Sequence, residues 1–169
     1  MTDDTPFEIV EISSLYGKTI QCAKRGNVLI SVTKITMFGL GRIQFPEQAE
    51  LSQLRQERHG NQRKFSKDHE KLKCLERLER LEYNWRRSQG NLKAVRDVGL
   101  RDSEELVRQL FGHLLIVGQS VSATSHQFSE IDAPLGRLHI QSYWQVLNDG
   151  RKYLTTVIFM SEMSAESKS

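Results

Sequence analysis

Residues 137–160, RLHIQSYWQVLNDGRKYLTTVIFM, are the most strongly patterned stretch of the sequence and decide the fold. Two runs rich in β-branched and aromatic residues, 137–147 and 151–160, flank Asn148-Asp149-Gly150, and a turn of this kind between two such runs predicts a hairpin. In the first run, apolar or small residues alternate with polar ones. We therefore expect one face of this hairpin to cover a core and the other to meet solvent.

A second β-rich region occupies the N-terminal quarter of the chain. The runs 7–12, 18–24 and 28–37 are β-prone, and Gly26-Asn27 separates the last two. Glycine and asparagine tolerate positive φ, which hairpin turns require. These runs predict an antiparallel β-meander over 7–37.

Residues 46–118, between the two β regions, show helical patterns. A helix over 46–58 would begin at Pro46 and end at Gly60. A longer helix starts near Phe65 and runs to Arg87, or further if Gly90 is absorbed. A third helix, over 102–118, opens on the capping pattern Asp-Ser-Glu-Glu and is apolar around most of its circumference, so we expect it at the centre of the core.

The order of strands, helices and strands favours an α+β fold. The N-terminal meander and the C-terminal hairpin would share one mixed or antiparallel sheet, with a central helical segment of about three helices, one of them long, packed on it. A chain of 169 residues fits one domain, which we place at 1–160. Residues 119–134 are expected to form a loop that could contain a short strand, and residues 161–169 a disordered tail.

An apolar stripe follows the long helix at heptad spacing, and a short coiled coil between two subunits or an intrachain two-helix hairpin would bury it. Its members are Leu78, Leu81, Trp85, Leu92 and Val95, and Ser88 interrupts it.

Positive charge is concentrated in the middle of the chain. Residues 51–101 hold fourteen Lys/Arg and seven Asp/Glu, whereas the rest of the chain holds ten and fourteen. A basic segment between acidic ends points to an anionic partner, although a solvated helix with surplus arginine would give the same count. Tyr83 and Trp85 beside Arg86 and Arg87 would suit stacking and phosphate contacts. The candidate nucleic-acid-binding residues are Arg63, Lys64, Lys67, Lys71, Lys73, Arg77, Arg80, Arg86 and Arg87.

Three functional hypotheses follow. The first is a non-enzymatic, dimeric protein that binds nucleic acid, DNA or RNA, through residues 51–101. The second is a self-associating structural protein or a protein–protein adaptor. The third is a small metal-independent ribonuclease-like enzyme that uses the polar face of 137–147, where His139 is a candidate general base with Tyr143 and Arg137 beside it. Whether His126 meets His139 is left open.

Other functional classes find no pattern. No Cys or His cluster has metal spacing, and Phe38-Gly39-Leu40-Gly41 lacks the third glycine of a dinucleotide-binding loop, so we expect neither a metal nor a cofactor. Cys22 and Cys74 are expected to be reduced thiols. The longest apolar run, 114–117, is far shorter than the roughly 20 residues of a membrane span. These features predict a cytoplasmic protein, or a nuclear one in a host with a nucleus.

Overall fold

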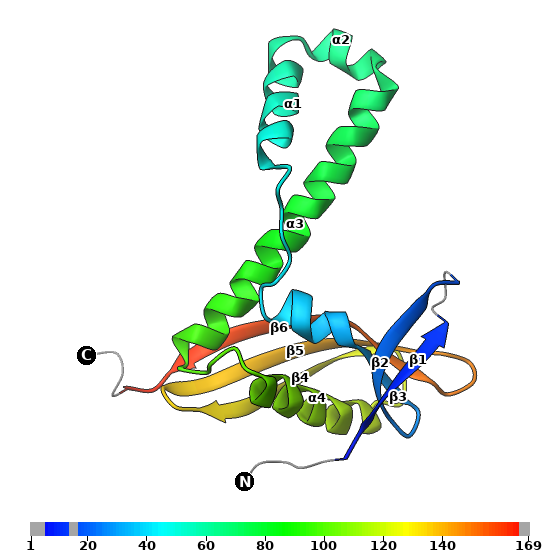
Figure 1. Ribbon diagram of the computed structural model, residues 1–169, viewed down its shortest axis with the longest axis vertical. Coiled ribbons are helices and arrows are strands. Elements are labelled where there is room, and N and C mark those ends of the chain that lie inside the picture. The colour runs from blue at the N-terminus through cyan, green and yellow to red at the C-terminus, as the bar shows by residue number, and fades with distance from the viewer. Residues whose placement is uncertain (1–5, 14–16, 166–169) are drawn as a thin grey trace.

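Six strands form one mixed sheet in the order β1-β2-β3-β6-β5-β4 in the computed structural model, which describes residues 6–13 and 17–165 (Figure 1). The α+β architecture expected from the sequence is confirmed. The strands are β1 (Glu8–Ser13), β2 (Thr19–Arg25), β3 (Val28–Ser31), β4 (Ser125–Ala133), β5 (Gly136–Val146) and β6 (Lys152–Met163). The helices are η1 (Lys34–Gly39), α1 (Gln48–Gly60), α2 (Gln62–Lys67), α3 (His69–Asp97) and α4 (Glu104–Gln119).

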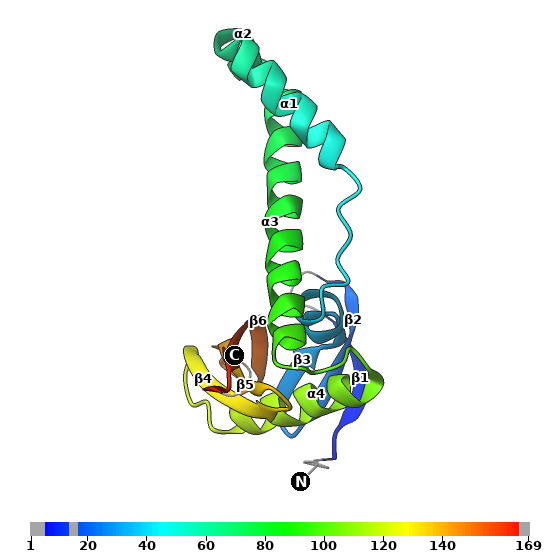
Figure 2. The same cartoon turned by 90° about the vertical axis from the view of Figure 1, so that its left-hand side faces the viewer.

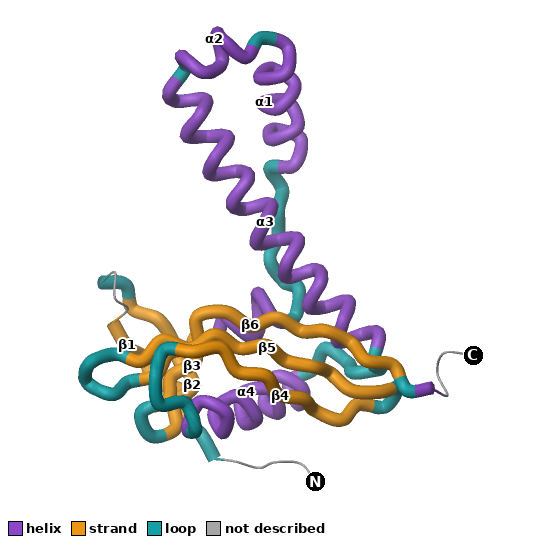
Figure 3. Tube along the Cα trace, turned by 180° about the vertical axis from the view of Figure 1, so that it is seen from behind, coloured by secondary structure: helices purple, strands orange, loops and turns teal. Residues whose placement is uncertain are grey.

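The N-terminal meander and the C-terminal hairpin meet through a short parallel contact. β1, β2 and β3 pair antiparallel in sequence order, as do β5 and β6. β3 joins β6 only through Val28↔Lys152 and Leu29↔Tyr153. Figure 3 shows that β6 and β5 run on well beyond β3. Among the described residues, one long side of β6 therefore has no neighbouring strand over most of its length.

The expected strand over 28–37 is wrong in its second half. β3 ends at Ser31, and the following residues form the π-helix η1. The run is β-prone, but β6 offers it a partner only at its start, so packing overrides the local preference. Ile35 and Gly39 of η1 are buried, and a Cβ at Gly39 would lie 3.3 Å from the Phe159 ring.

The segment 119–134, expected to be a loop that could contain a short strand, holds the nine-residue edge strand β4. This strand pairs with β5 from Ser125↔Trp144 to Ala133↔Gly136. Edge strands tolerate polar residues because one side of their backbone is solvated. β4 has few of the β-branched residues that would predict a strand from the sequence. β6 likewise continues to Met163, into the segment expected to be a disordered tail; of that tail, residues 166–169 lie outside the described residues.

The central segment contains four α-helices rather than about three. α2 is a separate short helix, and the Asn61 side chain caps it by accepting from the Lys64 backbone N–H. The Asp68 side chain caps α3 in the same way through Lys71. α3 absorbs Gly90 and runs unbroken over 29 residues. These two side-chain caps mark the beginnings of two separate helices, α2 and α3, where the chain turns.

α4 and the last turns of α3 pack with the sheet in the main core. Leu110, Leu114 and Leu115 of α4 are fully buried, together with Leu138, Ile140 and Trp144 of β5. The apolar face expected for residues 137–147 is therefore confirmed. α1, α2 and the first half of α3 project away from the sheet as a helical hairpin (Figures 1 and 2). In the described part of the chain no helix is long and apolar enough to cross a membrane, and both cysteines are free thiols.

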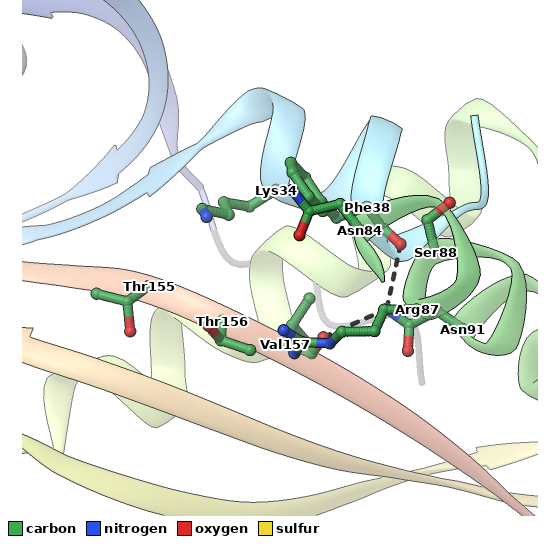
Figure 4. A pocket seen from close by; sticks show the side chains of 9 residues that line it. All are labelled: Lys34, Phe38, Asn84, Arg87, Ser88, Asn91, Thr155, Thr156 and Val157. Atoms are coloured by element: carbon green, nitrogen blue, oxygen red, sulfur yellow. Dashed lines mark hydrogen bonds between the residues drawn. The ribbon is translucent and has the colours of Figure 1, made fainter. Parts of the chain in front are cut away.

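A buried amide ties α3 to the unpaired side of β6. Asn91 is 4% exposed, and its Nδ2 donates to the carbonyls of Phe38 at 3.1 Å and Val157 at 3.3 Å (Figure 4). Its Oδ1 accepts from the Phe159 N–H at 2.9 Å. The side chain thus supplies to β6 the pair of bonds that a neighbouring strand would give. It fixes α3, η1 and β6 at one point.

Replacing this amide should destabilise the fold strongly. Asn91→Ala leaves the Val157 carbonyl and the Phe159 N–H buried without partners, and each orphaned group costs about 1–3 kcal/mol. We expect a loss of about 2–4 kcal/mol in the free energy of unfolding, measured by urea titration. The matched control is Gly90→Ala, one residue away, where nothing lies within 4 Å of the added Cβ and helix propensity improves. Equal stability of Asn91→Ala and wild type would show that the amide is not a structural link.

Candidate nucleic-acid interface

The helical hairpin has an apolar seam of its own, formed within one chain. Leu51 and Leu54 of α1 pack with Phe65, Leu75 and Leu78 in a second buried cluster. Leu81 and Trp85 are half-buried against it, and the Phe45 and Trp85 rings lie 5.9 Å apart. Of the two arrangements expected for the stripe, the structure has the intrachain hairpin. Leu78, Leu81 and Trp85 belong to or pack against this cluster, and Leu92 is 8% exposed beside Gly41.

Ion pairs along this seam occupy three carboxylates of the hairpin, those of Glu57, Glu79 and Glu82. Arg55 of α1 binds Glu82 at 3.0 Å and approaches Glu79 at 3.7 Å. Lys71 binds Glu57 of α1 at 2.7 Å. Arg86 also lies 3.7 Å from Glu82. Two of the nine candidate binding residues, Lys71 and Arg86, are therefore ion-paired here. Such pairs hold the two helices in register and neutralise this side of the hairpin.

The pairing shifts the ionisation of its members. The hydrogen bond from Arg55 holds the pKa of Glu82 below its usual range, despite the opposing effect of burial. The same bond raises the pKa of Arg55, and the hydrogen bond to Glu57 raises the pKa of Lys71. All of these groups are charged at neutral pH, so the pairs are intact there.

Four other cations form a row on a different face of α3. Lys73, Arg77, Arg80 and Arg87 are spaced four, three and seven residues apart, which places them along one side of the helix. At 1.5 Å per residue this basic row is about 21 Å long. None of the four has a carboxylate within ion-pair distance among the described residues, although Glu76 lies beside the row on the same helix. Glu76 and Arg80 stand four residues apart, a spacing that favours an ion pair, but the described residues show no ion pair between them.

The tip of the hairpin carries three further cations, Arg63, Lys64 and Lys67 of α2. All three are exposed, and within the described ranges no carboxylate pairs with them. Phe65 between them turns inward to the seam. The tip therefore extends the exposed positive surface beyond α3.

The aromatic residues of this segment divide between core and surface. Trp85 belongs to the seam, so it is not free to stack on a base. Tyr83 is 59% exposed, and the Arg87 guanidinium lies 5.3 Å from the centre of its ring. An exposed ring beside a guanidinium offers a flat surface for a nucleobase. Tyr83, and not Trp85, is the aromatic group available at the basic row.

The polar face of β5 offers no cationic site. Arg137 binds Glu130 at 3.0 Å and lies 3.6 Å from Asp132. His139 contacts Glu130 and hydrogen-bonds Glu162. His126 stacks on Tyr143 at 4.2 Å between ring centres, whereas His139 pairs with Glu130, four residues further along β4. The two histidines do not meet, and the nuclease hypothesis has no support from this arrangement.

Two residues of the site, Lys34 and Ser88, are not among those that the sequence predicts. The sequence predicts a strand at Lys34, but η1 brings this residue beside Arg87, and both line a cavity with Ser88. The only sign of Ser88 in the sequence is that it interrupts the apolar stripe. Among the described residues no group of three or more potential ligands could hold a metal ion.

A scan against protein-family models finds no match, and a search of the curated proteins finds no similar sequence.

The ion pairs of the seam predict an acid-sensitive hairpin. A carboxylate whose pKa is lower in the folded state adds stability above its unfolded pKa of roughly 4.3, and this stability is lost as the pH falls through the folded value. We expect the free energy of unfolding of wild type to fall between about pH 4.5 and pH 3. In Glu82→Gln the fall should be smaller in urea titrations at each pH. An equal fall in both proteins would show that Glu82 contributes no linkage.

Proposed function

We propose that this protein binds nucleic acid through the basic row on α3, defined by Lys73, Arg77, Arg80 and Arg87, with the tip cations of α2 adding to it. The observation that carries the proposal is the division of charge in the hairpin. Glu57, Glu79 and Glu82 neutralise cations at the seam, while the row has no ion-pair partner among the described residues. Unpaired Lys and Arg side chains gain most from a polyanion, because binding releases its condensed counterions.

The shape of the hairpin supports a polymeric ligand. It projects from the sheet (Figure 2), and the row follows α3 from this projecting part down to Arg87 at its root, beside η1 and β6. A straight row of about 21 Å follows a phosphate backbone better than it fits a compact anion. Tyr83 lies next to the row and allows a base to stack. Contacts of this kind, to phosphates and to base faces, favour a single strand and carry little sequence specificity.

Affinity should depend steeply on salt. A single strand contributes a slope of about −0.7 per contacted phosphate in a plot of log K against log salt, so four contacts give about −3. Binding is measured by fluorescence anisotropy with a labelled random-sequence oligonucleotide, at salt concentrations from about 50 to about 300 mM. A slope near zero would contradict the proposal.

Neutralising the row should weaken binding far more than neutralising paired cations. The triple variant Lys73→Gln/Arg77→Gln/Arg80→Gln should lose about tenfold or more in affinity at low salt, and its salt slope should shrink by about 2. The control Arg58→Gln/Lys71→Gln/Arg86→Gln removes the same net charge from residues that are ion-paired. Exposed ion pairs add only about 0–1 kcal/mol each, so the control should fold, which circular dichroism checks. Equal losses in the two variants would mean that the row is not the binding face.

We infer self-association as a second candidate function, since one face of the sheet exposes apolar side chains at an open edge. Phe128 of β4 is 71% exposed and Met160 of β6 is 47% exposed. β4 is the last strand of the sheet, and such a nine-residue edge can pair with a second copy across a two-fold axis. The same surface would serve an adaptor that docks another protein.

Light scattering tests this second candidate. Wild type should show a concentration-dependent dimer, and Phe128→Ser should remain monomeric at the same concentrations. Ile116→Ser is the matched control, because Ile116 is an exposed apolar residue of α4 at 40% exposure and not of the sheet. It should dimerise like wild type. A wild-type protein that stays monomeric at high concentration would contradict self-association.

A further inference from the structure

A small cavity lies at the root of the hairpin, where η1, α3 and β6 meet (Figure 4). Its volume is about 180 Å³. Lys34 and Phe38 line it from η1, Asn84, Arg87, Ser88 and Asn91 from α3, and Thr155, Thr156 and Val157 from β6. Asn91 is held by its three bonds to the backbone, so one wall of the cavity is fixed to both η1 and β6.

The described lining of this cavity carries positive charge alone. Lys34 and Arg87 are the ionisable residues among the described lining residues, which include no carboxylate. Burial, and then the charge of Arg87, lower the pKa of Lys34. The Lys34 ammonium lies 5.0 Å from the centre of the Phe38 ring, and Arg87 lies over Tyr83. Aromatic faces attract cations but leave their charge in place. The described residues therefore hold two cations together without a counterion.

Unused hydrogen-bond donors surround these cations. Ser88 is 0% exposed, and its hydroxyl is buried without a partner among the described residues. A buried hydroxyl without a partner is uncommon in native proteins and calls for an explanation. The Asn84 amide and the Thr156 hydroxyl also make no side-chain hydrogen bond in the described part of the chain, whereas Thr155 donates to the Tyr143 carbonyl. A ligand rich in acceptor oxygens would satisfy all of them.

Size and charge select the ligand. Cavities that bury a drug-sized molecule measure roughly 300–1,000 Å³, so this one accommodates a single small group. A phosphate monoester carries about −1.5 to −2 charges at pH 7, which matches two cations better than the single charge of a diester. Its three terminal oxygens accept several hydrogen bonds, and Arg87 can bind two of them side by side.

We propose that the cavity between Lys34, Arg87 and Ser88 binds a phosphate monoester group. The basic row ends at this cavity, since Arg87 belongs to both, so a strand lying on the row would place its terminal phosphate there. This source rests on the proposed nucleic-acid binding. A free small phosphate ester has the same chemistry, and the experiment separates the two.

The test compares ligands on the full chain. The probes are inorganic phosphate and a ten-nucleotide single strand with a 5′-phosphate, a 3′-phosphate or hydroxyl ends, measured by calorimetry and anisotropy. We expect one phosphorylated strand to bind about tenfold tighter than the hydroxyl-ended strand, as expected of two charge-assisted contacts. Inorganic phosphate should bind weakly and compete with it. If phosphate binds but neither phosphorylated end gives an advantage, the cavity takes small esters and the strand-end source is wrong.

Matched variants separate this site from the row. Lys34→Met and Ser88→Ala should each remove the advantage of the terminal phosphate and the binding of inorganic phosphate. The triple row variant should weaken all strands alike and keep both effects. Lys34→Met should be at least as stable as wild type to urea, because it relieves the contact between two cations, so its loss of binding is not a loss of fold.

Two outcomes overturn the proposal. One is that wild type does not bind inorganic phosphate and does not distinguish phosphorylated from hydroxyl ends. The other is that Lys34→Met and Ser88→Ala bind phosphate as wild type does. If instead phosphate binds through Lys34 while no oligonucleotide binds at all, the nucleic-acid function fails and the phosphate site stands.

Discussion

The three hydrogen bonds of Asn91 are the constraint on which the rest of the structure depends. β6 pairs with β5 along one side, but on its other side it pairs with β3 only at its first two residues. Beyond those two residues the β6 backbone needs another hydrogen-bond partner on that side. The buried amide supplies that partner and at the same time holds the end of η1. α3 is thereby fixed to the sheet at one turn, and the 29-residue helix extends outward from that anchor.

This anchoring explains how charge is distributed. α1 folds back onto α3 over an apolar seam, and Glu57, Glu79 and Glu82 pair with cations across or beside that seam. Cations on the remaining face of α3 are left to solvent. Because Asn84, Arg87 and Ser88 lie within two turns of Asn91, the end of this face is brought over η1 and β6, where Lys34 joins it. The row and the phosphate cavity are thus parts of one positive surface with a single structural origin.

Local patterns predicted much of the fold, whereas features that depend on pairing between distant segments were missed. The hairpin over 137–160, the buried helix α4 and the seam of Leu78, Leu81 and Trp85 each follow from periodicity within one segment. η1 and β4 do not, since η1 interrupts a β-prone run and β4 is a polar edge strand identified by its partner. The same limit applies to the site. Nine cations could be named from the sequence, but the pairing of Lys71 with Glu57, and the meeting of Lys34 with Arg87, arise only in three dimensions.

The central claim is that ion pairing divides the arginines of the hairpin into engaged and available groups. The most direct measurement is a nitrogen-15 NMR titration of the arginine side-chain Nε–H signals with a short single-stranded oligonucleotide. The signals of Arg77, Arg80 and Arg87 should shift together and saturate, while those of Arg55 and Arg58, paired with Glu79 and Glu82, stay in place. Shifts confined to the paired arginines, or spread equally over all five, would contradict the account.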